Sequence, residues 1–98
     1  MEIYGTFSSI KDYAFKNQIC RATISISNNI AEGFDRSSDA DFSRFLYIAL
    51  ASCSECKSML YLAEKLKYIS EERKLKLLEA GNEISKIFRG LIKSLKSK

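Results

Sequence analysis

Four basic residues near the C-terminus have the spacing of a single helix face. Separated by three, four and three positions, they are Lys86, Arg89, Lys93 and Lys96, and Lys98 follows. A row of cations can follow the phosphates of a nucleic acid, and its effect multiplies when several subunits present it together. A solvated helix face, whose cations suit the negative end of the helix dipole, has the same pattern. The row therefore marks candidate nucleic-acid contacts, and from the row alone both interpretations remain open. Tyrosines could stack on bases, but nothing in the placement of Tyr4, Tyr13 and Tyr61 requires it.

The residues that usually carry catalysis or bind metals are sparse. The chain has no histidine, which removes the commonest general base and the commonest metal ligand. Cys53 and Cys56 form a CxxC, but it falls inside a helical pattern, and a zinc site would need Cys20 and a carboxylate as well. Small buried residues at a close helix contact explain this pair better. There is no glycine-rich phosphate loop and no GxSxG elbow. We therefore expect no catalytic residue, no metal, no cofactor and no enzymatic activity.

A second group of polar residues predicts how two helices lie on each other. One helix pattern carries a polar line through Gln18, Arg21, Ser25, Asn29 and Glu32, and the next carries Arg44, Tyr47, Ser52 and Glu55. If the two helices fold back on each other near Ser38, residues whose numbers total 76 face each other. This register pairs Arg21 with Glu55, Glu32 with Arg44, and Asn29 with Tyr47.

We therefore expect the polar residues to form a structural network between the two helices. The alternative is ordinary solvated side chains on an outer face. If the network is buried, Arg21→Ala costs about 3 kcal/mol or more, because Glu55 is left without a partner.

These residues are positioned by three long helical patterns and a short one. The short pattern covers about Ile3 to Ile10, and the first long one runs from about Asp12 to Glu32, where Gly33 is expected to end it in a left-handed conformation. The second runs from Asp39 to Lys67 after a Ser38 cap, and the third follows a Ser70 cap and reaches about Leu95. The residues expected to point inward are Phe15, Ile19, Ala22, Ile26 and Ile30; Phe42, Phe45, Leu46, Ala49, Cys53, Cys56, Leu60 and Ala63; and Leu77, Gly81, Ile84, Phe88, Leu91 and Leu95.

Composition agrees with an all-α protein. Ninety-eight residues, 46% of them hydrophobic, suffice for one globular domain, residues 1–98, and the absence of proline favours helices. The net charge of +4 mildly favours anionic partners. No apolar run is long enough for a membrane span, and the N-terminus does not look like a secretory signal. With an odd number of cysteines, we expect a cytoplasmic protein with reduced thiols.

Two segments, QICRATISISNNIAEG and FSRFLYIALASCSE, resemble the family of the 23S rRNA intervening-sequence proteins. The matching positions are Gln18, Ile19, Arg21, Ala22, Ser25, Ile26, Asn29, Ile30, Ala31, Glu32 and Gly33, then Phe42, Arg44 to Ala49, Ser52 and Glu55. The chain departs from the family pattern at Cys20, where a basic residue is usual, and at Ser27, where proline is frequent.

The resemblance implies an antiparallel up-and-down four-helix bundle that assembles as a homopentamer. The family is similar to the accessory protein of diversity-generating retroelements, a basic pentameric barrel that binds nucleic acid and a reverse transcriptase, and many members have no known function. Members usually begin with a full-length first helix, whereas only about Met1 to Ile10 precede the second helix here. A shortened first helix leaves an apolar groove that invites a neighbouring subunit or another polypeptide. We expect a non-enzymatic, self-associating module that binds RNA or DNA; the alternative is a scaffold that docks a protein partner and no nucleic acid.

Overall fold

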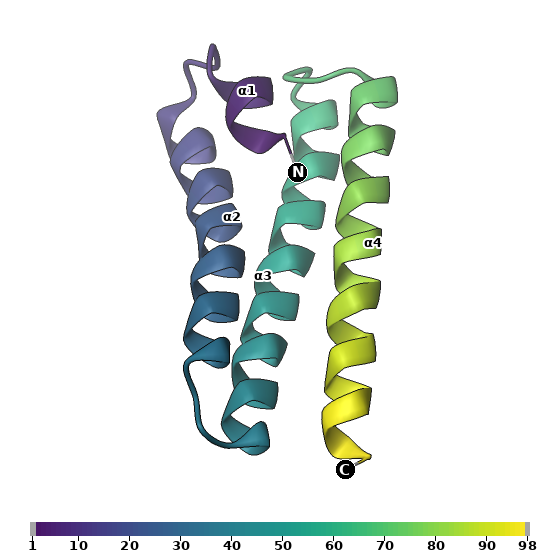
Figure 1. The fold of residues 1–98 in the computed structure, drawn as a ribbon. Coiled ribbons are helices and arrows are strands. Elements are labelled where there is room, and N and C mark those ends of the chain that lie inside the picture. The colour runs from purple at the N-terminus through teal and green to yellow at the C-terminus, as the bar shows by residue number, and fades with distance from the viewer. Residues whose placement is uncertain (1, 98) are drawn as a thin grey trace.

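The polypeptide forms a four-helix bundle whose first helix is short, and the computed structural model describes residues 2–97. The helices are α1 (Ile3–Phe7), α2 (Tyr13–Phe34), α3 (Asp39–Lys65) and α4 (Glu71–Lys96). The three long helices run alternately up and down, with α1 at the end of the bundle that holds the α3–α4 loop (Figure 1). The backbones of α2 and α4 each pack against α3 and not against each other. The predicted all-α architecture with a shortened first helix is confirmed.

Each long helix begins at a side-chain cap. The caps are Asp12, Ser38 and Ser70, and each side-chain oxygen accepts a hydrogen bond from the backbone N–H three residues further on. Such a bond satisfies one of the amides that a helix start leaves without an intrahelical partner. The two serine caps were predicted from the sequence and are confirmed.

Gly33 does not end α2 in a left-handed conformation, so that prediction is wrong. No glycine among residues 2–97 has a positive φ, and α2 continues through Gly33 to Phe34. A Cβ at Gly33 would lie 2.8 Å from Cδ1 of Phe42 and 3.3 Å from Cβ of Phe45. The glycine therefore allows the close approach of α2 to α3 near their connecting loop. A left-handed residue occurs instead at Lys67, in the α3–α4 loop, where φ is 63°.

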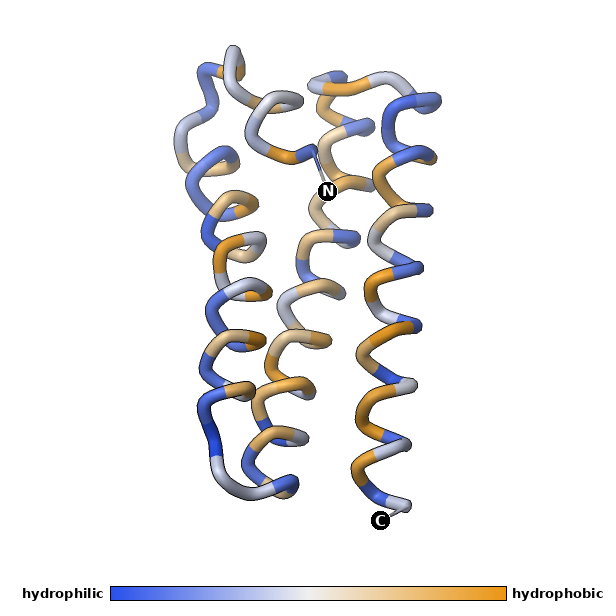
Figure 2. Tube along the Cα trace, viewed as in Figure 1, coloured by the Kyte–Doolittle hydropathy of each residue, from blue (hydrophilic) through white to orange (hydrophobic). Residues whose placement is uncertain are grey.

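Two apolar clusters fill the bundle, one above the other. The residues of the upper cluster are Ile3, Phe7, Phe15, Ile19, Met59, Leu60, Ala63, Leu77 and Leu78. The residues of the lower cluster are Ala22, Ile26, Leu46, Ala49, Cys53, Cys56, Phe88 and Ile92. Figure 2 shows the apolar residues recurring on the sides of α2 and α4 that face α3. Most residues expected to point inward do so, which confirms the periods read on α2 and α3.

The buried face of α4 is rotated from the predicted one. Leu91 is 37% exposed, whereas Ile92 and Ser85 are 5% and 1% exposed. The prediction assumed a heptad seam, but α4 packs mainly against the single helix α3, so the ordinary 3.6-residue period sets which residues are buried. Ile84 and Leu95 are only partly buried at the edge of this face.

Helix α1 is anchored by its ends and its apolar face. Ile3 and Phe7 are fully buried, and the Phe7 ring meets that of Phe15 edge-on with centroids 5.4 Å apart. Nε and Nη2 of Arg73 on α4 both donate to Oγ1 of Thr6, at 3.2 and 2.9 Å. These contacts hold five helical residues that would not be stable alone.

A hydrogen bond ties the start of α2 to the α3–α4 loop. The Tyr68 hydroxyl donates to Oδ2 of Asp12 at 2.6 Å, while the backbone N–H of Phe15 donates to Oδ1 at 3.1 Å. The Tyr68 bond, followed by the Phe15 bond, lowers the pKa of the Asp12 carboxyl below its ordinary value. The same bond from Tyr68 raises the pKa of the Tyr68 phenol.

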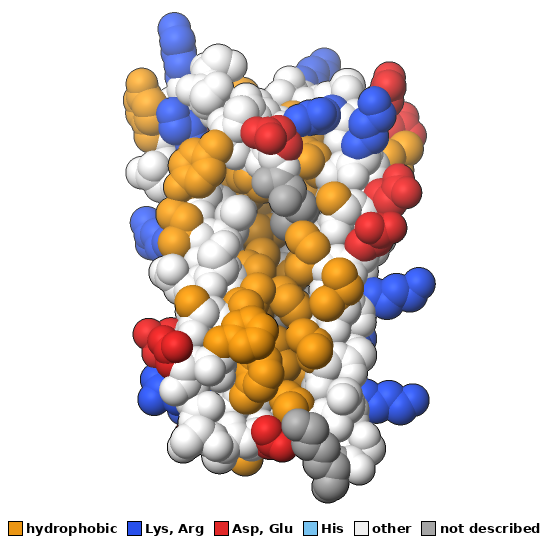
Figure 3. Space-filling view, in the orientation of Figure 1, with side chains coloured by type: hydrophobic (Ala, Val, Ile, Leu, Met, Phe, Trp, Pro, Cys, Tyr) orange, Lys and Arg blue, Asp and Glu red, His pale blue; other side chains and the backbone are white. Residues whose placement is uncertain are grey.

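Below α1, the space between α2 and α4 forms an apolar groove floored by α3. Space-filling atoms show it as a strip of hydrophobic side chains along the middle of this face (Figure 3). We define the groove by four partly buried apolar residues that pack against the lower cluster and by Leu91, which is seven positions after Ile84 on the same face of α4; the four are Ile30, Phe42, Ile84 and Leu95. The groove arises because α1 has five residues, whereas the other three helices have 22, 27 and 26. None of the helices in residues 2–97 combines the length and apolarity needed to cross a membrane.

Candidate nucleic-acid interface

The C-terminal half of α4 carries the net positive charge of the chain. From Ile84 to Lys96 there are four basic and no acidic residues, which leaves 12 basic and 12 acidic residues in the remainder of the sequence. The four predicted contact residues, Lys86, Arg89, Lys93 and Lys96, are all exposed. Within residues 2–97, none of them lies within ion-pair distance of a carboxylate. They are therefore free to meet an external anion.

Three of these cations line one pocket together with an aromatic ring. Arg89, Lys93 and Lys96 line a shallow pocket of about 430 Å³ between α3 and α4, together with Tyr47, Leu50 and Ile92. Nζ of Lys96 donates to the Tyr47 hydroxyl at 2.8 Å and lies 5.3 Å from the ring centroid. The Tyr47 side chain remains 47% exposed. The arrangement combines an apolar and aromatic floor with a cationic rim, and no carboxylate lines it.

Lys86 belongs to different surroundings. It lines the next pocket along α4, which it shares with Arg89 but also with Glu79 and Glu83. The two carboxylates oppose the approach of a phosphate on that side. The structure thus brings together Arg89, Lys93 and Lys96, and leaves Lys86 at the edge of the basic surface.

Sequence reasoning missed Tyr47 as part of this surface. We expected it opposite Asn29 on α2, but it lies on the side of α3 that meets α4. The sequence did contain a usable signal, because facing residues of the α3–α4 hairpin also have numbers with a constant total. Glu64 with Lys74 and Cys53 with Ser85 are hydrogen-bonded pairs of that hairpin, and both pairs total 138. The rule would have placed Tyr47 opposite the basic half of α4. Of the tyrosines considered for stacking, Tyr13 lies near the Lys16 ammonium. Tyr61 lies near the Lys74 ammonium and lines the adjoining pocket with Lys86 and Arg89.

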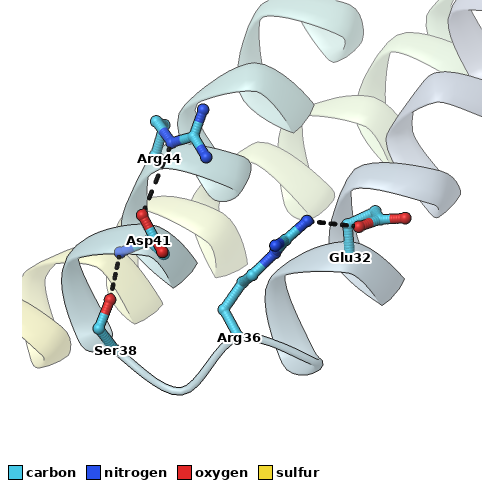
Figure 4. A network of polar contacts seen from close by, with 5 residues as sticks. All are labelled: Glu32, Arg36, Ser38, Asp41 and Arg44. Atoms are coloured by element: carbon cyan, nitrogen blue, oxygen red, sulfur yellow. Dashed lines mark hydrogen bonds and ion pairs between the residues drawn. The ribbon is translucent and has the colours of Figure 1, made fainter.

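Neither predicted ion pair between α2 and α3 is present. Glu32 pairs with Arg36 at 2.8 Å, and Nε of Arg44 lies 3.9 Å from Oδ1 of Asp41 (Figure 4). Local pairs at i,i+4 or i,i+3 on an exposed helix face need less ordering of long side chains than a bridge between helices. The guanidinium groups of Arg36 and Arg44 also each lie 4.8 Å from the Phe45 ring centroid. Arg44 thus has both of its contacts on its own helix.

The other predicted members of the network have different partners. Arg21 and Glu55 line one surface pocket of about 580 Å³, but they form no ion pair, and Oε2 of Glu55 accepts from Nε2 of Gln18 at 3.4 Å. Asn29 bonds to the backbone oxygen and the hydroxyl of Ser25, at 2.8 and 3.0 Å, rather than to Tyr47. Arg21, Glu32, Arg44 and Glu55 are all exposed, so the predicted ionic network is wrong for these residues.

The CxxC lies in the packed interior, as predicted. Cys53 and Cys56 are both fully buried. The Cys53 thiol donates to the Gly81 carbonyl at 3.4 Å and accepts from the Ser85 hydroxyl at 3.2 Å, and Ser85 accepts from the Lys57 ammonium at 3.0 Å. Burial raises the pKa of the Cys56 thiol, which keeps it in its unreactive protonated form. The described residues bring no group of three His, Cys, Asp or Glu side chains together.

The fold and the basic surface define a small helical-bundle protein with a cationic C-terminal helix. The chain belongs to the 23S rRNA-intervening sequence protein family, whose model matches residues 1–90. It is similar to a crystal structure from Bacteroides thetaiotaomicron, described as a protein of unknown function from the S23 ribosomal protein family. The TM-score is 0.86 at 31% identity, over 94% of this chain and 86% of that one. No curated protein matches.

Proposed function

We propose that this protein is a non-enzymatic module that self-associates and binds nucleic acid through the basic surface of α4. The observation that supports it best is that Arg89, Lys93 and Lys96 line one pocket with Tyr47, with no carboxylate among the residues that line it. Cations without ion-pair partners release counterions from phosphates at little cost, because no existing pair must be broken.

Self-association makes such a small surface effective. Three phosphate contacts per subunit give a slope of only about −2.7 for the logarithm of the binding constant against the logarithm of salt concentration on duplex DNA. Copies held in one assembly sum their contacts and raise the apparent affinity. The resemblance to the retroelement accessory protein makes a homopentamer the expected assembly.

The test is a filter-binding titration of structured RNA and duplex DNA at about 50 mM and about 200 mM salt. A triple variant, Arg89→Gln, Lys93→Gln and Lys96→Gln, should lose most of the binding and most of the salt dependence. A matched control removes three exposed cations at the opposite end of the bundle: Lys11→Gln, Lys65→Gln and Lys76→Gln. If neither nucleic acid binds at the lower salt, or the control loses as much as the triple variant, the proposal is wrong.

A second candidate function is docking of a protein partner, and the apolar groove is the observation that favours it. At its upper end the position of a fourth helix is taken by α1, which buries Ile3 and Phe7 four residues apart. The occupant that continues this interface is an amphipathic helix with apolar residues at the same spacing.

Docking of this kind should respond weakly to salt, and Leu91→Glu on the groove wall should abolish it. Light scattering of the protein alone shows whether such a helix comes from a second copy of this chain or from another protein. A wild-type oligomer that Leu91→Glu dissociates would make the occupant a second copy, whereas a monomer would make it another protein.

A further inference from the structure

The pocket around Tyr47 contains more than a phosphate site needs. Cations alone are sufficient to follow a phosphate backbone. Here Arg89, Lys93 and Lys96 line the same pocket as the aromatic side chain of Tyr47 and the apolar side chains of Leu50 and Ile92. An aromatic and apolar lining beside cations suits a ligand that is planar on one side and anionic on the other.

We propose, on the basis of the proposed function, that this pocket takes an unpaired nucleotide of a single-stranded nucleic acid. The base stacks on Tyr47, and its flanking phosphates lie against Arg89 and Lys93. Base stacking on an aromatic side chain tolerates any sequence, since every base has a π-face. The site therefore selects strandedness rather than sequence.

A duplex cannot use the same floor. Its bases are stacked on one another, and only their edges reach the grooves. Tyr47 projects from the side of α3 between two helices, and its ring is only half-exposed. A duplex would meet the cationic rim but leave the ring without a partner.

Lys96 orients the ring by donating to the Tyr47 hydroxyl at 2.8 Å. The hydroxyl and the ring of Tyr47 therefore have different functions, and two variants remove them one at a time. Tyr47→Phe keeps the aromatic face and loses the bond to Lys96, whereas Tyr47→Leu keeps an apolar side chain and loses the face. Comparing the two variants shows whether binding needs an aromatic ring for stacking or only an apolar side chain.

The path of the strand follows from the carboxylates nearby. On the Lys86 side, Glu79 and Glu83 line the adjoining pocket and repel phosphates. Beyond Arg89 towards the C-terminus, α4 carries only basic charges. The strand therefore runs along Arg89, Lys93 and Lys96, away from Lys86.

The experiment is a fluorescence anisotropy titration of the full chain with labelled oligothymidylate and oligouridylate. Both are about 15 nucleotides long, near the upper end of typical single-strand site sizes. A duplex DNA of the same length runs in parallel, at one low salt concentration. The thymidylate and uridylate arms separate DNA from RNA as the source of the strand. Circular dichroism confirms that each variant is folded.

We expect single strands to bind more tightly than the duplex. Tyr47→Leu should weaken single-strand binding about tenfold per site, the usual effect of losing a stacked base, and leave duplex binding unchanged. Tyr47→Phe should stay within about twofold of wild type for both ligands.

Two results would overturn the inference in distinguishable ways. If Tyr47→Leu binds single strands as tightly as wild type while Arg89→Gln with Lys93→Gln does not, the nucleic-acid function stands and the stacking site is wrong. If wild-type protein binds neither single strands nor duplex, the proposed function fails and the inference fails with it.

Discussion

The hydroxyl of Ser25 on α2 lies 2.9 Å from the hydroxyl of Ser52 on α3. Their numbers total 77, one position from the predicted register of 76, and Asn29 completes a short polar chain by donating to Ser25. The predicted register therefore placed the two helices within one residue of their observed alignment, but it assigned the contacts to the wrong residues. Two short hydroxyls at the half-buried seam align α2 on α3, and the longer charged residues extend past it into solvent.

The first prediction concerns this serine pair. Ser52→Ala should lower the free energy of unfolding by about 1 kcal/mol, because its half-buried hydrogen bond to Ser25 is lost. Ser25→Ala should cost somewhat more, about 1–2 kcal/mol, because it also removes the bond from Asn29, and the double variant should cost about as much as Ser25→Ala alone. Urea denaturation of the three variants provides the measurement. Fully additive losses would show that the two hydroxyls act independently.

Arg21→Ala should change the free energy of unfolding by less than about 0.5 kcal/mol. The residue is exposed and forms no ion pair with Glu55, so its removal leaves no buried charge. The buried network expected from the sequence required a loss of about 3 kcal/mol or more. Urea denaturation at neutral pH decides between the two, and a loss near the larger value would contradict the exposed position of this residue.

Gly33→Ala should destabilise the protein by about 1–3 kcal/mol, even though alanine is the better helix former. The new Cβ would lie 2.8 Å from a ring carbon of Phe42 and 3.3 Å from Cβ of Phe45, so the Phe42 ring or the two helices must shift. Gly90→Ala is the matched control, since nothing lies within 4 Å of its Cβ position on α4. It should stabilise the protein by about 0.5–1 kcal/mol through helix propensity alone. Thermal melts of both variants compare them, and a stabilised Gly33→Ala would mean that the helix contact is not close.

The hydrogen bond between Tyr68 and Asp12 should make stability depend on pH at both extremes. The pKa of Asp12 is lowered in the folded state, so its contribution is present above its unfolded pKa near 3.8 and is lost as pH falls through the folded value. The pKa of Tyr68 is raised, so its contribution is present below its unfolded pKa near 10.0 and is lost as pH rises through the folded value.

Thermal melts of wild type and Tyr68→Phe test this dependence. The difference in Tm between them should be widest around neutral pH and should narrow at pH values below the ordinary pKa of an aspartate. In an Asp12→Asn background, the difference in Tm caused by Tyr68→Phe should no longer change as the pH becomes acidic. A difference in Tm that stays constant from neutral to acidic pH would contradict the assigned bond.

Lys93→Gln should weaken nucleic-acid binding more than Lys86→Gln. Both are exposed lysines on α4, seven positions apart, but only Lys86 has carboxylates lining its pocket. Removing one phosphate contact should also reduce the salt slope by about 0.7–0.9, and we expect that reduction at Lys93. Anisotropy titrations over a salt series measure both quantities, and equal losses at the two positions would argue for a diffuse cationic surface.

Much of the fold could be predicted because it depends on local patterns. The caps at Ser38 and Ser70 and the buried residues Ile19, Ala49 and Leu60 follow from short-range spacing. The function of Gly33 could not be found in this way, because a glycine near a helix end has the same sequence signature whether it turns the chain or admits a neighbouring ring. Only the position of Phe42 separates the two.

The charged residues were the hardest to place because their partners compete. The guanidinium of Arg44 can reach Asp41, the ring of Phe45 or a carboxylate on α2, and these options differ by little energy on an exposed surface. Tyr47 was misplaced because its neighbours are set by the register of α3 on α4, in which positions that total 138 face each other, and not by the register of α2 on α3. The basic residues of α4 were found from spacing alone, but which of them share a pocket with Tyr47 and which share one with Glu79 and Glu83 depends on how α3 lies on α4.

The uneven distribution of charge along α4 also gives the whole molecule an electric dipole. The bundle is 46 Å long, and its positive charge is concentrated towards the end at which α4 finishes, while the rest of the chain is close to electrically neutral. A polyanion therefore exerts a torque on the bundle before any contact forms, turning the end of α4 forward. At low ionic strength such pre-alignment shortens the search for a productive encounter, so added salt should slow capture as well as weaken the bound state.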